Sequence, residues 1–505
     1  MDEKILIAGA GPTGLVLALW LTKMGVPVRI VDKDATSGQT SRAMIVHART
    51  LEFYHQIGIA HALCEKGIVV KGVTIRQKGS VAASIVFGEM GKEESPFPFI
   101  LSFPQDEHEK ILIEHLHHAG VSVERNTELV EFSDVNDHVV ATLKKPDGIE
   151  TVSTPYLLGC DGARSEIRNQ LKLDFPGGTY SQLYFVADVL AHGDAVKGDM
   201  EFCLGDADFT LVFPIRASGS VRLIGIVPKA VEHKKTIEFS DIASFVEKNT
   251  KISISKVNWF STYHSHHRVA EHFRKGRVFL LGDAGHIHSP VGGQGMNTGL
   301  GDAINLSWKM AAVLKNRAAS SILDSFEIER IRFAHQLTST TDKVFQAVTN
   351  EGFLGKCIRK VWFTHVFPWI MRFDKAKLFL FKTVSQIKIH YRSSLISKGA
   401  AGKIHGGDRL PWVRMGENDN FKSLEILDWQ MHIYGKLQED FHREIARLGL
   451  AVQVFPWTEA AHKAGLQENA VYLIRPDGYI AYANSNQDIQ GLQEFIATHK
   501  ILPRI

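Results

Sequence analysis

The first residues of the chain combine apolar runs and glycines in a pattern that predicts a strand, a helix and a second strand. Residues 4–8 (KILIA) form a short apolar run typical of a buried strand, and residues 13–24 (TGLVLALWLTKM) are apolar at nearly every position that a helix could bury. Residues 26–32 (VPVRIVD) then predict a second strand. This order is typical of the start of a parallel sheet covered by helices.

Later segments extend this first unit. Residues 107–118 (EHEKILIEHLHH) have the apolar spacing of a helix, and residues 121–145 alternate as antiparallel strands do. Residues 154–162 (TPYLLGCDG) and 276–286 (GRVFLLGDAGH) are buried-strand patterns that end in glycine-rich turns, and a long helical stretch is predicted over 297–348. These elements predict one domain that is made from two distant parts of the chain.

The segment between these two parts has a different pattern. From 176 to 262 the chain contains short β-like runs, such as QLYFVADV, FTLVFPI and VRLIGIV, which are separated by glycine, aspartate and lysine. We interpret this segment as a mainly antiparallel layer inserted between the two halves of the first domain.

The pattern changes again toward the C-terminus. Residues 361–371 (VWFTHVFPWIM) are the most apolar patch, but they are too few to span a bilayer and are interrupted by Pro368. A buried helix or an interface is the favoured interpretation, and contact with a membrane surface is the alternative. The glycine-rich residues 400–412 (AAGKIHGGDRLPW) are interpreted as a linker, and residues 421–505 predict a small α/β domain.

Composition narrows the class of protein. A chain of 505 residues favours several domains, and its 58 basic and 55 acidic residues leave a net charge of only +3, which argues against a nucleic-acid partner. The four cysteines form no CxxC pair, so no metal site is predicted. Without a signal peptide pattern or a run of eighteen apolar residues, we expect a cytoplasmic protein with no integral membrane association, and a homodimer as a possible assembly.

A glycine-rich turn joins the first predicted strand to the first helix. It reads GAGPTG over residues 9–14, and Asp32 ends the second strand. In this arrangement Gly9 permits a tight turn, Gly11 leaves room for a pyrophosphate, and Gly14 lets the helix pack closely on the strand. The phosphate would lie at the helix N-terminus, where N–H groups and the helix dipole favour anions. The turn therefore predicts dinucleotide binding, with Asp32 accepting hydrogen bonds from both ribose hydroxyls.

A second glycine-rich segment identifies the dinucleotide. It reads GDAGHIHSPVGGQGMNTGLGDAINLSWKM over residues 282–310. With this segment the sequence resembles the FAD-dependent aromatic hydroxylases, the para-hydroxybenzoate and phenol hydroxylases with their polyketide-hydroxylase relatives, along nearly the whole chain. The resemblance implies that Asp283 binds the ribityl chain of FAD and that the turn from Pro290 to Asn297 runs beside the isoalloxazine ring. A helix that begins near Asn297 would stabilise the anionic reduced flavin.

The same resemblance extends to a DG motif. Residues 159–168 (GCDGARSEIR) resemble the family segment that is associated with both FAD and the reduced nicotinamide. The resemblance implies a cofactor role for Asp161. Arg164 and Arg168 have two open interpretations, as phosphate ligands or as solvated surface residues.

Residues 40–53 (TSRAMIVHARTLEF) resemble the family's arginine-bearing strand and helix near the flavin. The resemblance implies that Arg42 binds the pyrophosphate, that Gln105 contacts the flavin side and that the backbone of Leu129 contacts adenine. The complete set of expected cofactor-binding residues is Gly9, Gly11, Pro12, Thr13, Gly14, Asp32, Lys33, Arg42, Gln105, Leu129, Asp161, Gly162, Asp283, Pro290, Gly293, Gly295, Met296 and Asn297.

The chain contains neither a second GxGxxG nor a CxxxxC, so it lacks the nicotinamide domain and the dithiol of disulfide reductases. Hydride would therefore come from transiently bound NADPH or NADH. The resemblance implies that reduced FAD and O2 form a C4a-hydroperoxide, which hydroxylates an aromatic or phenolic small molecule. Another flavin-dependent oxidoreductase, such as a halogenase or a reductase, and a non-catalytic flavin sensor or binding protein remain as alternatives, although no halogenase-type WxWxIP segment occurs.

The inserted layer is expected to provide the substrate surface. Tyr184, Phe202, Phe209 and Phe213 are candidates for its lining, and each has core packing as the other interpretation. The sequence does not identify a general base. His47, on the flavin-side strand, is a weak catalytic candidate, and a hydrogen-bonded structural histidine is the favoured alternative.

The C-terminal segment, through YLIRPDGYIAY at 472–482, resembles the thioredoxin-like domain of larger family members. Because no cysteine follows Cys357, thiol chemistry is excluded there and a structural or interface role is favoured. The fold class expected from the whole chain is α/β. Its parts are a Rossmann-like FAD-binding domain (1–175, continued at 271–400 with the long helical segment), an inserted antiparallel β substrate layer (176–270) and a C-terminal thioredoxin-like domain (401–505).

Overall fold

The computed structural model describes residues 4–38, 43–77, 79–86, 88–196, 199–205, 209–216, 220–289, 291–349 and 361–502. Its central sheet has the strand order β18-β19-β12-β1-β2-β8 and is parallel except at the edge strand β18. The strands are β1 (Ile5–Ala8), β2 (Val28–Val31), β8 (Val123–Glu124), β12 (Leu157–Gly159), β18 (Arg274–Lys275) and β19 (Val278–Leu280). Strands from two distant parts of the chain therefore form one sheet, as predicted.

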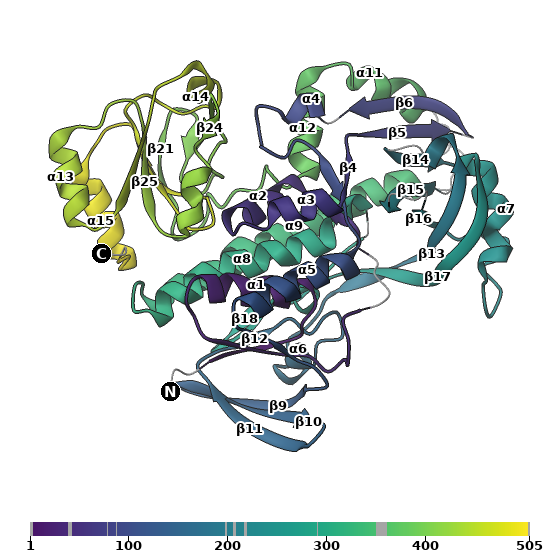
Figure 1. The fold of residues 1–505 in the computed structure, drawn as a ribbon, viewed down its shortest axis with the longest axis horizontal. Helices are drawn as coiled ribbons and strands as arrows, with labels where there is room; N and C mark the ends of the chain where they lie inside the picture. The colour runs from purple at the N-terminus through teal and green to yellow at the C-terminus, as the bar shows by residue number, and fades with distance from the viewer. Residues whose placement is uncertain are drawn as a thin grey trace.

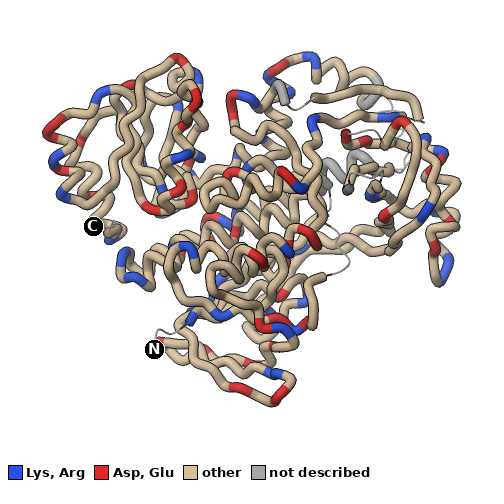
Figure 2. Tube along the Cα trace, in the orientation of Figure 1, with Lys and Arg blue, Asp and Glu red and all other residues tan. Residues whose placement is uncertain are grey.

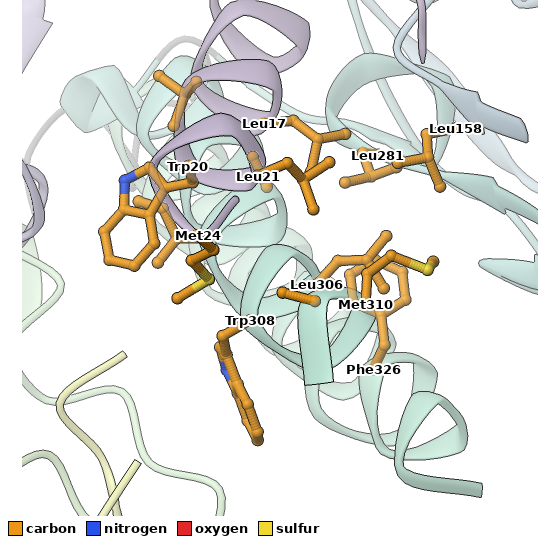
Figure 3. Close-up of a cluster of buried hydrophobic side chains, with 14 of the residues drawn as sticks. Leu17, Trp20, Leu21, Met24, Leu158, Leu281, Leu306, Trp308, Met310 and Phe326 are labelled. Carbon is orange, nitrogen blue, oxygen red and sulfur yellow. The ribbon is translucent and has the colours of Figure 1, made fainter. Parts of the chain in front are cut away.

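Helices pack against this sheet in the middle of the molecule (Figure 1). They are α1 (Pro12–Lys23), α5 (Gln105–His118), α8 (Gln294–Leu314) and α9 (Asp324–Thr349). Helix α1 is buried along nearly its whole length, and Leu17 and Leu21 share a core cluster with Leu306 and Met310 of α8 (Figure 3). This burial explains why α1 is apolar on all sides.

The prediction of one helical stretch over 297–348 was wrong in its continuity. Helix α8 ends at Leu314, and a short 3-10 turn precedes α9. Asn316 has a positive φ of 55°, a left-handed conformation that stops an α-helix. The two helices can therefore pack on each other instead of forming one rod.

A large second sheet contains the strands of the predicted substrate layer and has the order β20-β17-β13-β16-β15-β14-β5-β6. Its strands are β5 (Gly72–Gln77), β6 (Ser80–Val86), β13 (Gly177–Gly193), β14 (Met200–Leu204), β15 (Phe209–Arg216), β16 (Ser220–Ile226), β17 (Ile252–Val269) and β20 (His286–Ile287). Helix α7 (Phe239–Thr250) covers one face. The predicted layer lacked β5 and β6, which come from far earlier in the chain. Strand β5 pairs in parallel with β14, and β6 pairs antiparallel with β5.

The C-terminal part contains a separate mixed sheet of order β22-β21-β28-β27-β25-β26 (Figure 1). Its elements are β21 (Lys398–Ala401), β22 (Ile404–His405), β25 (Gln430–Tyr434), β26 (Ala451–Phe455), β27 (Val471–Ile474), β28 (Ile480–Asn484), α13 (Glu439–Arg447), α14 (Glu459–Lys463) and α15 (Ile489–His499). The prediction of a linker at 400–412 was wrong, because this segment enters the sheet as β21 and β22. A Cβ at Gly407 would lie 2.4 Å from the backbone nitrogen of Arg392, so this glycine permits close packing.

Buried charges join the C-terminal sheet to the helices. Arg475 donates to both carboxylate oxygens of Glu329, at 2.8 and 3.0 Å, and Lys309 donates to the same carboxylate at 2.9 Å. Asp477, in the turn between β27 and β28, accepts a hydrogen bond from the indole of Trp308 at 3.0 Å. This turn therefore lies in the contact between the two parts of the molecule.

Smaller elements complete the fold. They are β3 (Ile45–Val46), β4 (Ile68–Val70), β7 (Ile100–Ser102), β9 (Glu128–Val135), β10 (His138–Lys145), β11 (Gly148–Thr154), α2 (Ala48–Gln56), α3 (Ala60–Lys66), α4 (Gly88–Gly91), α6 (Glu166–Gln170), α11 (Phe367–Ile370) and α12 (Asp374–Val384). Basic and acidic residues are interspersed over the described trace (Figure 2).

The prediction of a buried helix at 361–371 was wrong. None of the described residues of α11 is buried, and Trp369 is 57% exposed. Among the helices that the structure describes, none is both long and apolar enough to cross a bilayer. The apolar patch therefore lies at the protein surface.

Candidate active site

The first glycine-rich turn leaves an open space at the start of α1. A Cβ at Gly9 would lie 2.2 Å from the carbonyl oxygen of Cys160, and one at Gly14 would lie 2.0 Å from the carbonyl oxygen of Gly9. Both positions therefore exclude a side chain. Gly11 differs, because a Cβ there would meet nothing within 4 Å. Space beside Gly11, next to the N-terminus of α1, fits a pyrophosphate group.

Asp32 lies at the end of β2 and faces this turn. Its Oδ2 accepts a hydrogen bond from the backbone N–H of Ala10 at 2.6 Å, and its Oδ1 accepts one from Asp34 at 2.8 Å. Lys33 is exposed beside it. The carboxylate is thus held at the mouth of the turn, where a ribose would follow the pyrophosphate.

The second glycine-rich segment packs directly on the first. A Cβ at Gly282 would lie 2.6 Å from the hydroxyl of Thr13, and one at Gly299 would lie 2.4 Å from the same atom. Thr13 therefore lies between the GD turn and helix α8. Asp283, in the 3-10 turn at Gly282–Ala284, is exposed beside this contact.

Helix α8 begins with backbone N–H groups that lack a side-chain cap. Its N-cap is Gly293, in the left-handed conformation with φ 62°, and no described side chain caps it. The N–H groups of Gln294, Gly295 and Met296 have no partner within the helix, because the first turn lacks preceding carbonyls. A Cβ at Gly293 would lie 2.7 Å from the side chain of Ile45, so this end of α8 lies against β3. Such a helix end attracts negative charge.

Asn297 links the α8 end to α2. Its side-chain oxygen accepts from the backbone N–H of His47 at 2.9 Å and from Thr50 at 2.8 Å, and its Nδ2 donates to the carbonyl of Ile45 at 2.8 Å. The side chain is 1% exposed. It therefore holds β3 and α2 against the glycine-rich turn.

His47 is fully buried beside the same turn. Its Nε2 lies 3.1 Å from the carbonyl oxygen of Gly292, and burial lowers the pKa of the ring to about 4. Nδ1 has no hydrogen-bond partner among the described residues. The imidazole is therefore neutral at neutral pH, with Nε2–H donating to the turn.

An acidic residue that the sequence did not single out supports the GD turn. Asp302, which is fully buried on α8, accepts from the backbone N–H of Gly282 at 3.0 Å and lies 2.6 Å from Nε2 of His286. Arg330 donates to its other oxygen at 2.6 Å. Against the effect of burial, the charges of Arg330 and His286 lower the pKa of Asp302. An aspartate inside the apolar stretch LGDAINLSW is the signal that could have revealed it.

The DG motif borders the same region. Burial raises the pKa of Asp161, whose Oδ2 accepts from the backbone N–H of Ile167 at 3.2 Å, while Oδ1 is buried without a partner among the described residues. Gly162 follows with φ 80°. Arg168 is buried and donates to the carbonyl of Ala284 at 2.9 Å, whereas Arg164 is exposed. Arg168 thus ties α6 to the GD turn.

The other expected cofactor residues have simpler surroundings. Gln105 begins α5 and donates to Glu109 at 2.8 Å. Leu129 is 9% exposed on β9 and pairs with Leu143. Pro12 occupies the first turn of α1. Arg42 and Pro290 lie outside the described residues.

The aromatic candidates of the substrate layer lie on one face of the large sheet. Tyr184, Phe209 and Phe213 are buried in one cluster with Ile45, and Phe202 packs against it. Their neighbours on the same strands, such as Phe185 and Val212, point to the face covered by α7. Ile45 lies next to Gly293, so the aromatic face and the α8 end are adjacent. Together, Tyr184, Phe202, Phe209 and Phe213 form what we call the aromatic face.

Comparisons with known proteins agree with this arrangement. The family model described as FAD binding domain matches residues 2–341. The chain is 30% identical to 6-methylpretetramide 4-monooxygenase of Streptomyces rimosus over 99% of this chain and 94% of that protein. It is 30% identical to pentachlorophenol 4-monooxygenase of Sphingobium chlorophenolicum over 81% of this chain and 76% of that protein.

Solved structures resemble the whole chain. CabE, an aromatic hydroxylase from angucycline biosynthesis, has a TM-score of 0.79 and 25% identity over 100% of both chains. The flavin-dependent monooxygenase PieE, solved in complex with FAD and substrate, has a TM-score of 0.81 and 21% identity over 99% of both chains. Because PieE is only 21% identical to this chain, its likeness concerns the fold alone.

Proposed function

Because the chain belongs to the FAD-dependent aromatic hydroxylases, we propose that it inserts one atom of O2 into an aromatic or phenolic small molecule, with NADPH or NADH as the reductant. It is an FAD-dependent monooxygenase. When bound, FAD accepts hydride from the nicotinamide and activates O2. The protein's own residues bind, orient and shield the reactants.

One observation carries this proposal. Thr13 lies between Gly282 and Gly299, so the first glycine-rich turn, the GD turn and the start of α8 meet at one place. The aromatic face lies next to the same helix end. An anion-binding helix terminus beside an apolar aromatic surface suits a flavin ring that faces an aromatic substrate.

The proposed FAD contacts come from the motifs described above. The N-terminus of α1 beside Gly11 would bind the pyrophosphate, Asp32 a ribose, and Asp283 the ribityl chain. The first N–H groups of α8, at Gly295 and Met296, would then stabilise negative charge on the reduced ring. Arg42, Gln105, Leu129 and Pro290 remain proposed contacts on the strength of the resemblance alone.

His47 suits a positioning role better than that of a general base. With a pKa of about 4, its ring is a poor proton acceptor for a phenol at neutral pH. The hydrogen bond of Nε2 to the Gly292 carbonyl instead holds the glycine-rich turn at the start of α8.

The experiment is a screen of aromatic and phenolic compounds with the FAD-loaded protein, which follows NAD(P)H oxidation and the mass of the product. We expect at least one compound to accelerate oxidation and to gain one oxygen atom that derives from isotopically labelled O2. Oxidation that yields only hydrogen peroxide with every compound would contradict hydroxylation.

A matched pair of variants tests the substrate surface. Phe213→Leu alters the aromatic face, whereas Phe185→Leu makes the same change on the face covered by α7. We expect Phe213→Leu to raise KM for the accepted compound and Phe185→Leu to change only stability. Equal KM values for both variants would remove this face from the proposed site. The homodimer also remains a proposal, which sedimentation velocity tests.

A further inference from the structure

The exposed aromatic side chains of the described chain are confined to one surface. Trp362 is 44% exposed, Trp369 57%, Phe373 53% and Phe379 59%, and no other described Trp, Phe or Tyr is exposed. These residues lie on and around α11 and α12, which we call the α11–α12 surface. Large aromatic side chains seldom gather in water without a binding role.

The same surface carries an excess of positive charge. Asp374 is the sole acidic residue between positions 361 and 392. The basic residues in this range are Arg372, Lys375, Lys377, Lys382, Lys388 and Arg392. Lys377 pairs with Asp374 and Lys382 with Glu94, at 3.2 and 2.7 Å. Arg372 and Lys375 are exposed beside the aromatic side chains.

A groove at this surface borders the cluster that contains the aromatic face. It lies between β6 and the two helices, which are adjacent in Figure 1, and has a volume of about 890 Å³. Its lining includes Ile85 and Met90 on one side and Pro368 and Met371 on the other. Ile85 belongs to the cluster of the aromatic face, and Met90 and Met371 pack against that cluster.

Charge decides which partner fits. In a symmetric dimer the same patch would face its own copy, so two basic surfaces would be brought together at a cost. Anionic phospholipid attracts Lys and Arg near its surface, while Trp and Phe enter the zone between headgroups and acyl chains. The combination of exposed aromatic and basic residues is complementary to such a bilayer.

We propose that the α11–α12 surface docks the protein on an anionic lipid bilayer as a peripheral membrane protein. Trp369 and Phe373 insert below the headgroups, and Arg372 and Lys375 contact the anionic lipids. A second part of this proposal rests on the proposed function. The groove gives a lipophilic aromatic substrate a path from the bilayer to the aromatic face.

Vesicle flotation tests the docking without any substrate. The FAD-loaded protein is mixed with vesicles of phosphatidylcholine alone or of phosphatidylcholine with phosphatidylglycerol. We expect binding to the mixed vesicles that weakens with salt. The double variant Arg372→Gln/Lys375→Gln should weaken this binding about thirtyfold, and Trp369→Ser/Phe373→Ser at least about tenfold. Brominated phosphatidylcholine mixed with phosphatidylglycerol should quench tryptophan fluorescence, and Trp369→Phe should retain binding with less quenching.

Control variants carry the same changes elsewhere. Lys422→Gln/Lys436→Gln removes two exposed lysines of the C-terminal part, and Val454→Ser removes a side chain that is 50% exposed there. Both should bind vesicles as the unmodified protein does. Failure of the unmodified protein to float with anionic vesicles would overturn the proposal. So would a shift from dimer to monomer in Trp369→Ser/Phe373→Ser without any vesicle binding. Hydroxylation in the aromatic screen would remain unaffected by either result.

Discussion

Glu329 provides the sharpest test of how the C-terminal part is attached. Its carboxylate is fully buried between Arg475 of the C-terminal sheet and Lys309 of α8, and it also accepts from Asn305 at 2.6 Å. Burial alone would raise the pKa of Glu329, but the charges of Arg475 and Lys309 lower it to about 2. The change Glu329→Gln keeps the size of the side chain and removes its charge. Buried Lys309 then lacks a counter-ion, and Arg475 keeps only Asp477 as its counter-ion.

The expected loss follows from this geometry. A fall in pKa from 4.5 to about 2 corresponds to roughly 3 kcal/mol in favour of the ionised form. Breaking a buried ion pair by removing one partner costs about 3–5 kcal/mol, which agrees. We therefore expect Glu329→Gln to lower the free energy of unfolding by about 3 kcal/mol. This contribution is complete above pH 4.5 and is lost as the pH falls toward 2.

Urea unfolding of the FAD-loaded protein, followed by fluorescence, measures this loss. Arg443→Gln is the control, because Arg443 and Asp440 form an exposed pair whose side chains are 68% and 91% exposed, and we expect a change below about 0.5 kcal/mol. Replacing Glu329 and Lys309 together by methionine, which leaves Arg475 paired with Asp477, should recover much of the stability. If Glu329→Gln unfolds at the same urea concentration as the control, the reasoning is refuted.

Further predictions concern the cofactor site and pH. Gly14→Ala should prevent correct folding, since its Cβ would lie 2.0 Å from a carbonyl oxygen, whereas Gly11→Ala should leave the circular dichroism spectrum unchanged and weaken FAD binding at least about tenfold in a titration. Asp302→Asn should cost about 3–5 kcal/mol by leaving Arg330 without a charged partner. This change should also speed FAD release, which is seen as a rise in flavin fluorescence. An unchanged release rate would show that Asp302 does not support the FAD site. Burial lowers the pKa of His432 from 6.5 to about 3, so the unfolded chain binds the extra proton between these values and stability falls as the pH decreases below 6.5. His432→Gln should flatten this decline between about pH 6.5 and pH 5 in urea unfolding, and an equal slope would show that His432 does not titrate in this way.

The sequence by itself determined the local elements and the glycine motifs. Short-range sterics decide these features: Gly9 and Gly14 are required where backbone atoms touch, and Gly11 where a ligand needs space. Apolar periodicity likewise predicted β1, α1 and α5. The family resemblance then identified the cofactor as FAD, because the GAGPTG turn, the DG motif and the GD segment all resemble FAD-binding motifs of that family.

Only the tertiary structure decided which distant residues meet. The pairing of β5 with β14, the common face of Phe209 and Tyr184, and the burial of Asp302 beside Arg330 depend on contacts between remote positions. Local patterns also gave wrong predictions where one composition is compatible with two different structures. Glycines suggested a linker at 400–412 although they permit close strand packing. The apolar residues 361–371 suggested burial although Val361, Trp362 and Trp369 are exposed. Burial is a property of the surrounding chain, so a short segment's own residues cannot specify it.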